Sequence, residues 1–332
     1  MKDFSIREVI GLMARTSSFL VFRFLVYFAI TLAYVLVTGA GAGMGWMIGG
    51  IGDNAAAGGM WGGIIGFGLV SVVMYLLREY LLYLVKAGHI AVLVEILDGG
   101  TLPEGRGQID HAQQVVRERF GEASVLFGVD QLIKAVLKTF NRAFLSVASL
   151  IPIPGLKGVV SFINTVIRLS LTYLDEVILA YNIRERSDNP WATSRTALIL
   201  YAQNYRAFLR NAFFLAFFIW GLTLLVFLLI LGPVAALTAL FPGTAGPITL
   251  MIAVVFAWGV KQAVIEPIGM TALMQVFFKV TEGQSPDPEW EARLEKLSGK
   301  FRAFADRASS WASGRDRAAE SVDGAAGSPD RA

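Results

Sequence analysis

The feature that most constrains this chain is a set of apolar runs long enough to cross a bilayer. Residues 212–231 contain no ionisable side chain, and similar runs cover 19–38, 60–77 and 248–278. The hydrocarbon core of a bilayer is about 30 Å thick and needs about 20 helical residues. Apolar residues make up 55% of the chain and charged ones 17%, and the mean hydropathy of +0.57 is too high for a soluble globule. The sequence therefore predicts an all-α, polytopic helical membrane protein with four full spans.

The composition also limits the chemistry available to the chain. There is no cysteine, and the two histidines, His89 and His111, lie far apart on different segments. Thiol catalysis and thiolate metal sites are excluded, and a histidine metal cluster is not expected. No nucleotide loop, hydrolase elbow or zinc-protease motif is present, and a net charge of +3 does not favour nucleic acid. We expect no enzyme activity, catalytic residue, cofactor, metal or nucleic-acid partner.

The placement of lysine and arginine indicates how the chain is oriented. The stretches 39–59 and 232–247 contain neither, whereas the N-terminus, residues 98–122 and 184–210, and the tail are rich in them. Because such loops stay in the cytoplasm, we predict a multi-pass inner-membrane protein with both termini cytoplasmic. The predicted domains are an N-terminal span pair (1–85), a cytoplasmic insert (86–125), a central polar-seamed helical hairpin (126–185), an interfacial helix with the C-terminal span pair (186–280), and a cytoplasmic amphipathic helix with a disordered tail (281–332).

The first two spans are joined by a glycine-rich stretch. Residues 39–68 contain thirteen glycines, which predicts an external turn followed by a close-packed start to the second span. Gly58, Gly62 and Gly66 form a small-xxx-small face on that span. Two interpretations stay open, a surface for another helix or glycines tolerated without a partner. Arg23 interrupts the first span near its end, so its side chain is expected to reach the headgroups.

The centre of the chain is predicted to be a hairpin of two helices over 127–183, linked by a proline-containing breaker at 151–155. Each helix carries one polar stripe at helical spacing. The stripes hold Asp130, Lys134, Lys138, Asn141, Arg142, Ser146 and Ser149 on the first helix, and Lys157, Ser161, Asn164, Arg168, Thr172, Asp175 and Glu176 on the second. Folding the pair would bring Lys134 and Lys138 opposite 168–176, where charges of both signs neutralise each other. The candidate polar seam is therefore Lys134, Lys138, Arg168, Asp175 and Glu176. The alternative is a hairpin lying flat on the membrane with its stripes facing water.

The last span contains a second polar face. Lys261, Gln262 and Glu266 occur before the apolar pattern ends at Phe278. Pro267 removes a backbone hydrogen bond, which predicts a kink. The polar face has two interpretations, an ion pair at the membrane interface or a buried ion or substrate site.

Two segments outside the spans are predicted to be amphipathic helices. Asn189 and Pro190 are a good start for a basic helix over 191–210, which we interpret as interfacial. In the tail, an apolar seam recurs at alternating steps of four and three, and consists of Trp290, Leu294, Leu297, Phe301, Phe304, Ala308 and Trp311. We expect this seam to dock on the chain's own cytoplasmic helices or on a neighbouring subunit, and no structure beyond Ser313.

Part of the chain resembles a known family. The segment 201–215 (YAQNYRAFLRNAFFL) is followed by a span, a neutral loop, a last span with Ile268, Gly269 and Met270, and a cytoplasmic tail. This pattern and order resemble the C-terminal part of choline transporter-like proteins. The resemblance covers at most the last 150 residues, and the chain is too short for the ten spans of that family. It implies transport and an inner-face position for 191–210, and it transfers no substrate residue.

Two functional hypotheses follow. The first is a membrane protein that transports a small or amphiphilic solute, with the hairpin seam as part of the path. The second is a non-transporting membrane scaffold that acts through helix contacts. The predicted partners are the lipid bilayer, a small-molecule solute, and further copies of the chain through the glycine-rich second span or the tail helix.

Overall fold

The computed structural model describes residues 2–101, 107–120, 123–149, 157–239 and 246–326. Within these ranges it contains helices and no strand, which confirms the all-α prediction. The helices are α1 (Ile6–Arg15), α2 (Ser17–Ile51), α3 (Ala55–Leu97), α4 (Gly107–Phe120), α5 (Ala123–Ser149), α6 (Lys157–Thr172), α7 (Leu174–Glu185), α8 (Pro190–Gln203), α9 (Tyr205–Thr238), α10 (Gly246–Val260), the π-helical turn η1 (Lys261–Ile265), α11 (Glu266–Thr281), α12 (Pro288–Leu297) and α13 (Gly299–Ala326).

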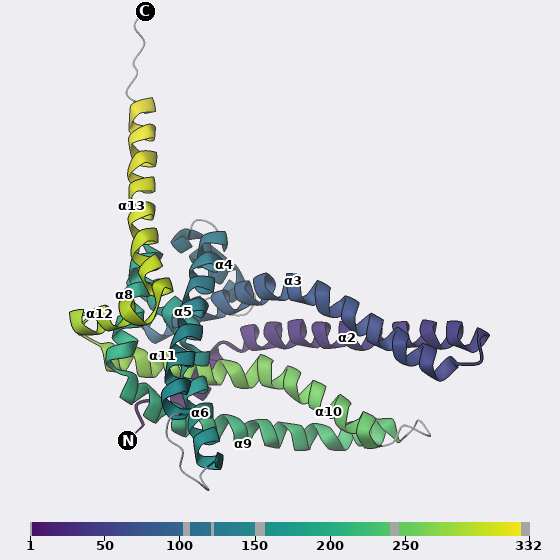
Figure 1. The fold of residues 1–332 in the computed structure, drawn as a ribbon. Helices are drawn as coiled ribbons and strands as arrows, with labels where there is room; N and C mark the ends of the chain where they lie inside the picture. The colour runs from purple at the N-terminus through teal and green to yellow at the C-terminus, as the bar shows by residue number, and fades with distance from the viewer. Residues whose placement is uncertain (1, 102–106, 121–122, 150–156, 240–245, 327–332) are drawn as a thin grey trace, which may run out of the picture.

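Four helical segments are long and apolar enough to cross a membrane, as predicted. They are Ser17–Ile51, Ala55–Tyr75, Tyr205–Ala236 and Ile252–Thr281. The corresponding helices α2, α3, α9 and α10 extend side by side from a helical body at one end of the molecule (Figure 1). In the most apolar part of the first three spans only 17% of residues are buried, against 61% in the last. The first three therefore present most of their surface outward, as lipid-facing helices do, whereas the last one enters the packed body.

The contact between α2 and α3 contradicts the external turn predicted after residue 38. Helix α2 continues through the glycines to Ile51, and the turn is confined to 52–54. A Cβ atom on Gly45 would lie 2.1 Å from the carbonyl oxygen of Gly58, and one on Gly62 would lie 2.1 Å from that of Gly41. Glycine is required here because the two backbones touch. The face that includes Gly58 and Gly62 is thus covered by the same chain, and a homo-oligomer through the second span would need another of its surfaces.

The predicted hairpin forms α5, α6 and α7 rather than two helices. Helix α6 ends at Thr172, and Tyr173 separates it from α7. Helices α5 and α6 contact each other and run crosswise to the four spans (Figure 1). Neither belongs to the four candidate spans found in the described residues. The breaker at 151–155 lies outside the described residues.

Helix α8 begins as predicted, because the Ala192 N–H donates to Asn189 Oδ1 at 3.2 Å and Pro190 occupies the first turn. The helix does not lie at an edge of the body. Residues 197–202 are all buried, since α7 packs on one side of α8 and the tail helices pack on another. Of the three arginines in the predicted basic helix 191–210, Arg195 binds Glu291 and Glu295 of α12 and Arg210 binds Asp3. The interfacial position of this helix stays a prediction.

The apolar seam of the tail, except for the exposed Leu297, is docked on the chain itself. Phe301 and Phe304 are fully buried, and Phe304 packs on Trp191 of α8. Trp311 Nε1 donates to the Asp188 carbonyl at 2.8 Å. Helix α13 continues to Ala326, beyond the point where composition predicts no structure. Alanine, arginine and glutamate are good helix formers, and a helix already fixed over 299–311 avoids the cost of a new nucleus.

The last two spans differ from prediction in detail. Helix α9 runs past residue 231 to Thr238 with Pro233 inside it. The expected break at Pro267 is a π-helical turn at 261–265. Each carbonyl there accepts from the N–H group five residues later. For example, the Glu266 N–H donates to the Lys261 carbonyl. The next donor in this register would be Pro267, which has no N–H, so the Gln262 carbonyl is left without a backbone partner.

Candidate functional site

A charged cavity lies where the spans enter the helical body. Its volume is about 450 Å³. It is lined by Tyr27 and Tyr34 of α2; Ser71, Tyr75, Leu82, Tyr83, Lys86 and Ile90 of α3; Asp130 and Lys134 of α5; Asp175, Glu176 and Leu179 of α7; and Gln262 of η1. From Ser71 to Ile90 the α3 wall is about 28 Å long at 1.5 Å per residue. The cavity therefore extends from the body into the stretch of α3 that belongs to the second span.

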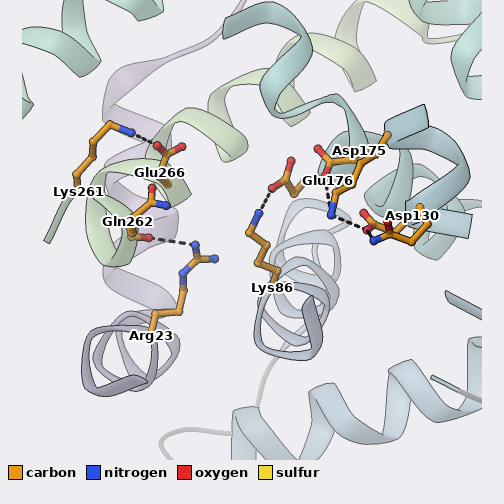
Figure 2. A network of polar contacts seen from close by, with 10 residues as sticks. Arg23, Lys86, Asp130, Asp175, Glu176, Lys261, Gln262 and Glu266 are labelled. Atoms are coloured by element: carbon orange, nitrogen blue, oxygen red, sulfur yellow. Dashed lines mark hydrogen bonds and ion pairs between the residues drawn. The ribbon is translucent and has the colours of Figure 1, made fainter. Parts of the chain in front are cut away.

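Ion pairs across this cavity join three helices. Lys86 Nζ of α3 binds Glu176 Oε1 of α7. Lys134 Nζ of α5 lies 2.7 Å from Asp130 Oδ2 and 3.9 Å from Asp175 Oδ2. Figure 2 shows Lys86 of α3, Asp130 of α5, and Asp175 and Glu176 of α7 pointing toward one another. The arrangement gathers three carboxylates and two lysines around one space.

The acids of this group have opposite pKa shifts. Burial acts to raise the pKa of Glu176, but the charge and hydrogen bond of Lys86 outweigh it and lower the pKa to about 2. Burial and the adjacent Glu176 raise the pKa of Asp175 well above its usual range. Asp130 also has a raised pKa, because burial outweighs the attraction of Lys134. Glu176 is thus held ionised, whereas Asp175 is the acid most readily protonated.

The two predicted stripes meet beside this cavity. Lys134 and Lys138 of α5 face Arg168 and Asp175 across a groove of about 440 Å³. Lys138 and Arg168 are exposed, while Asp175 is buried. All five residues of the predicted polar seam therefore lie at the cavity or at this groove. The side chains at 141–163, which include the far ends of both stripes, lie outside the described residues.

The predicted polar face of the last span is brought to the same region. Lys261 Nζ binds Glu266 Oε1, and both side chains are half-buried. Gln262 lines the cavity, and its carbonyl accepts from Arg23 Nη2 at 3.2 Å. Arg23 thus supplies the hydrogen-bond donor that Pro267, which has no N–H, cannot supply to the Gln262 carbonyl. Of the two interpretations, this geometry places Gln262 and Glu266 on cavity walls inside the protein.

Arg23 contradicts the expectation that its side chain reaches the headgroups. It is 2% exposed and points into the protein. It lines a second cavity of about 130 Å³ that shares Tyr27, Lys86, Glu176 and Gln262 with the larger one. This residue sits in an apolar run, and its burial follows from α2 packing between α3 and the last span.

Arg23, Lys86 and Tyr83 were not predicted as site residues. Lys86 and Tyr83 lie where α3 leaves the span, in a stretch that resembles an ordinary helix end. One signal was available, because Tyr83, Lys86 and Ile90 share a helical face on a continuous helix. Their partners on α5 and α7 are about 45 and 90 residues away, and that juxtaposition needs the tertiary structure.

The histidines are structural neighbours of the site rather than members of it. His89 is fully buried, its Nε2 lies 3.0 Å from Thr16 Oγ1, and its ring stacks on Phe19. His111 of α4 is half-buried rather than a surface residue. Among the described residues, no group of three histidine, aspartate or glutamate side chains is arranged to hold a metal ion.

The fold and the cavity together define a polytopic helical membrane protein with a charged interior site. No protein family, curated protein or solved structure matches the chain. The resemblance of residues 201–215 and the last two spans to choline transporter-like proteins therefore stays a prediction.

Proposed function

We propose that this multi-pass protein of the inner membrane moves a small polar or amphiphilic solute through the charged cavity between α2, α3, α5 and α7. The observation that carries the proposal is the cavity itself, about 450 Å³ with three acids and two lysines on its walls. A cavity of this size is within the usual range for small-molecule sites. The resemblance to choline transporter-like proteins adds to this proposal.

The free-energy cost of enclosing charged side chains at this site also favours a transport function over a scaffold function. Taking a charged side chain out of water into a protein interior costs several kcal/mol per ion, and ionisable residues enclosed in a membrane protein often mark solute or ion pathways. A scaffold that acts through helix contacts would be better served by an apolar core, because replacing a buried ion pair with apolar residues is often neutral or stabilising. The charges at Lys86, Glu176 and Asp175 are therefore explained by a polar solute.

The proposed orientation places the helical body and both termini in the cytoplasm. The body carries the segments rich in lysine and arginine, and the opposite ends of the spans, 39–59 and 232–247, carry none. In this orientation the charged cavity opens near the inner face. Solute would pass between there and the outer face along α2 and α3.

The absence of cysteine from the chain allows a direct test. Ser71→Cys places a thiol on the cavity wall with little change in shape, and a membrane-impermeant maleimide is applied to either side of oriented vesicles. A transport path predicts labelling from both sides. Leu228→Cys, whose side chain is 56% exposed on the outer surface of α9, should be protected by lipid from both sides. Ser309→Cys on the exposed surface of α13 should label from the cytoplasmic side alone.

The scaffold hypothesis makes a different prediction for the same variants. A static cavity would leave Ser71→Cys labelled from one side at most, under every condition tested. That result, with Leu228→Cys and Ser309→Cys behaving as stated, would overturn the transport proposal.

A further inference from the structure

Most charged side chains around the two cavities form close ion pairs, but Arg23 and Asp175 do not. Lys86 binds Glu176, and Lys261 binds Glu266. Lys134 is 2.7 Å from Asp130 but 3.9 Å from Asp175, so Asp130 is its main partner. Among the described residues of this group, Arg23 then remains unpaired, and Asp175 has only the longer contact with Lys134 and a hydrogen bond with Glu176. No ion pair joins Arg23 to a carboxylate in the described part of the chain.

Arg23 is a buried cation with donors to spare. Its Nη2 donates to the Gln262 carbonyl, whereas Nε and Nη1 have no hydrogen-bond partner in the described residues. Its side chain is fully enclosed and lines the smaller cavity. The acids on the same wall, Glu176 and Glu266, attract the Arg23 charge, but each is bound by a lysine and neither forms an ion pair with Arg23.

Asp175 is the carboxylate of this group that lacks a close ion pair. The groups that face it are Tyr83 and Lys86 of α3, Asp130, Lys134 and Lys138 of α5, Arg168 of α6 and Glu176 of α7. The exposed Lys138 and Arg168 are screened by solvent at the mouth of the groove. The groove also gives the Asp175 carboxyl a route to water. Burial and Glu176 raise the pKa of Asp175, and the groove gives its carboxyl access to protons from solvent.

The charge balance couples these two residues. With Asp175 ionised, Arg23, Lys86, Lys134 and Lys261 balance Asp130, Asp175, Glu176 and Glu266. With Asp175 protonated, one positive charge is in excess, and the only base in this group without a bound acid is Arg23, as far as the described residues extend. A monoanion beside Arg23 restores the balance. Proton and anion therefore favour each other's binding.

We propose that the smaller cavity binds the carboxylate of a small organic monoanion against Arg23, and that Asp175 takes up one proton from solvent with it. The remainder of the anion extends past Tyr27 into the larger cavity, because the two cavities share Tyr27, Lys86, Glu176 and Gln262. An inorganic anion such as chloride would leave that larger space unused. This inference rests on the proposed function, since it names the class of solute.

Calorimetry on the full chain in lipid nanodiscs tests the proposal without any transport step. The probes are sodium butyrate, uncharged butyramide and sodium chloride. Butyrate should bind and butyramide should not, and chloride should bind at least about tenfold more weakly, by about 1.4 kcal/mol. Titrations in two buffers of different ionisation enthalpy should show about one proton taken up per butyrate. The apparent Kd should rise about tenfold per pH unit once Asp175 is ionised, as one linked proton requires.

Three variants locate the site. Arg23→Gln keeps a donor for the Gln262 carbonyl but loses the charge, and should weaken butyrate binding by about 30-fold or more. Asp175→Asn should bind butyrate with no proton uptake and no pH dependence. Lys300→Gln removes one positive charge at an exposed position of α13, away from both cavities, and should behave as wild type. Thermal melts of each variant report whether it is folded.

The outcomes separate this inference from the proposed function. Equal binding of butyrate and butyramide, equal binding of chloride and butyrate, or butyrate binding without proton uptake would each overturn the inference in the wild-type protein alone. If butyrate binds as expected but Ser71→Cys labels from one side only, the anion site stands and transport does not. If Ser71→Cys labels from both sides and butyrate does not bind, transport stands and the anion site does not.

Discussion

Removal of Lys86 alone should destabilise the protein far more than removal of Lys86 together with Glu176. In Lys86→Met the Glu176 carboxylate, 7% exposed, stays buried without its counter-charge. Breaking a buried pair costs about 3–5 kcal/mol. Because the Lys86 side chain is 33% exposed, water can partly replace it, and we expect the lower end, about 3 kcal/mol.

The double variant Lys86→Met/Glu176→Gln should lie within about 1 kcal/mol of wild type, because neither residue leaves a charge behind. The coupling free energy is then about 2 kcal/mol or more. The free energy of unfolding is measured by denaturant titration in mixed micelles. Lys279→Met, the same substitution at an exposed position, should change it by less than about 0.5 kcal/mol. If the costs of Lys86→Met and Glu176→Gln simply add, the ion pair does not stabilise the fold.

The pH dependence gives an independent check on the same pair. In the native protein the pKa of Glu176 is lowered from 4.5 to about 2. A lowered carboxyl pKa contributes stability that is present above pH 4.5 and is lost as the pH falls toward 2. Without Lys86, burial raises the pKa of Glu176, while the hydrogen bonds from Asp175 and from the backbone still lower it. In Lys86→Met the contribution of this residue should therefore shrink, so that stability falls less steeply than in wild type as the pH decreases.

Four further predictions concern the rest of the chain. Gly62→Leu should cost more than about 3 kcal/mol, because its Cβ meets the Gly41 carbonyl at 2.1 Å, whereas Gly43→Leu has open space and should be tolerated in the same denaturant titration. Asp175→Asn should reduce the loss of melting temperature that ionisation of Asp175 causes as the pH rises, because burial and Glu176 raise the pKa of that carboxyl. Phe304→Ala should cost about 3–5 kcal/mol and expose α13 to limited proteolysis. A reporter fused after Ala332 should be active in the cytoplasm; activity on the outer side alone would contradict the orientation.

The parts of the fold that were predictable are those set by local chemistry. The four spans follow from hydrophobic runs, and the start of α8 follows from Asn189 and Pro190. The meeting of the two hairpin stripes follows from their spacing, although Lys134 is bound mainly by Asp130 of its own helix and Glu176 by Lys86 of α3. Each of these needs only the neighbours along one helix or an immediate helical partner.

The parts that were not predictable depend on contacts between distant elements. Glycines at 39–51 suggest a turn because glycine is a poor helix former in water, yet here they allow α2 to touch α3. The position of Arg23 near the end of the first span suggests that its side chain reaches the headgroups. In the structure it is buried and donates to the Gln262 carbonyl instead. Pro267 predicts a kink, but only the backbone register shows that the freed carbonyl belongs to Gln262 rather than Ala263.

The glycine contact between α2 and α3 has a mechanical consequence. At Gly41, Gly45, Gly58 and Gly62 backbone touches backbone, so no side chain there could change rotamer and let the helices slide. The two spans therefore form one stiff unit. In the proposed transport, opening of the cavity toward the outer face would come from the opposite wall, which includes Gln262 of the π-helical turn.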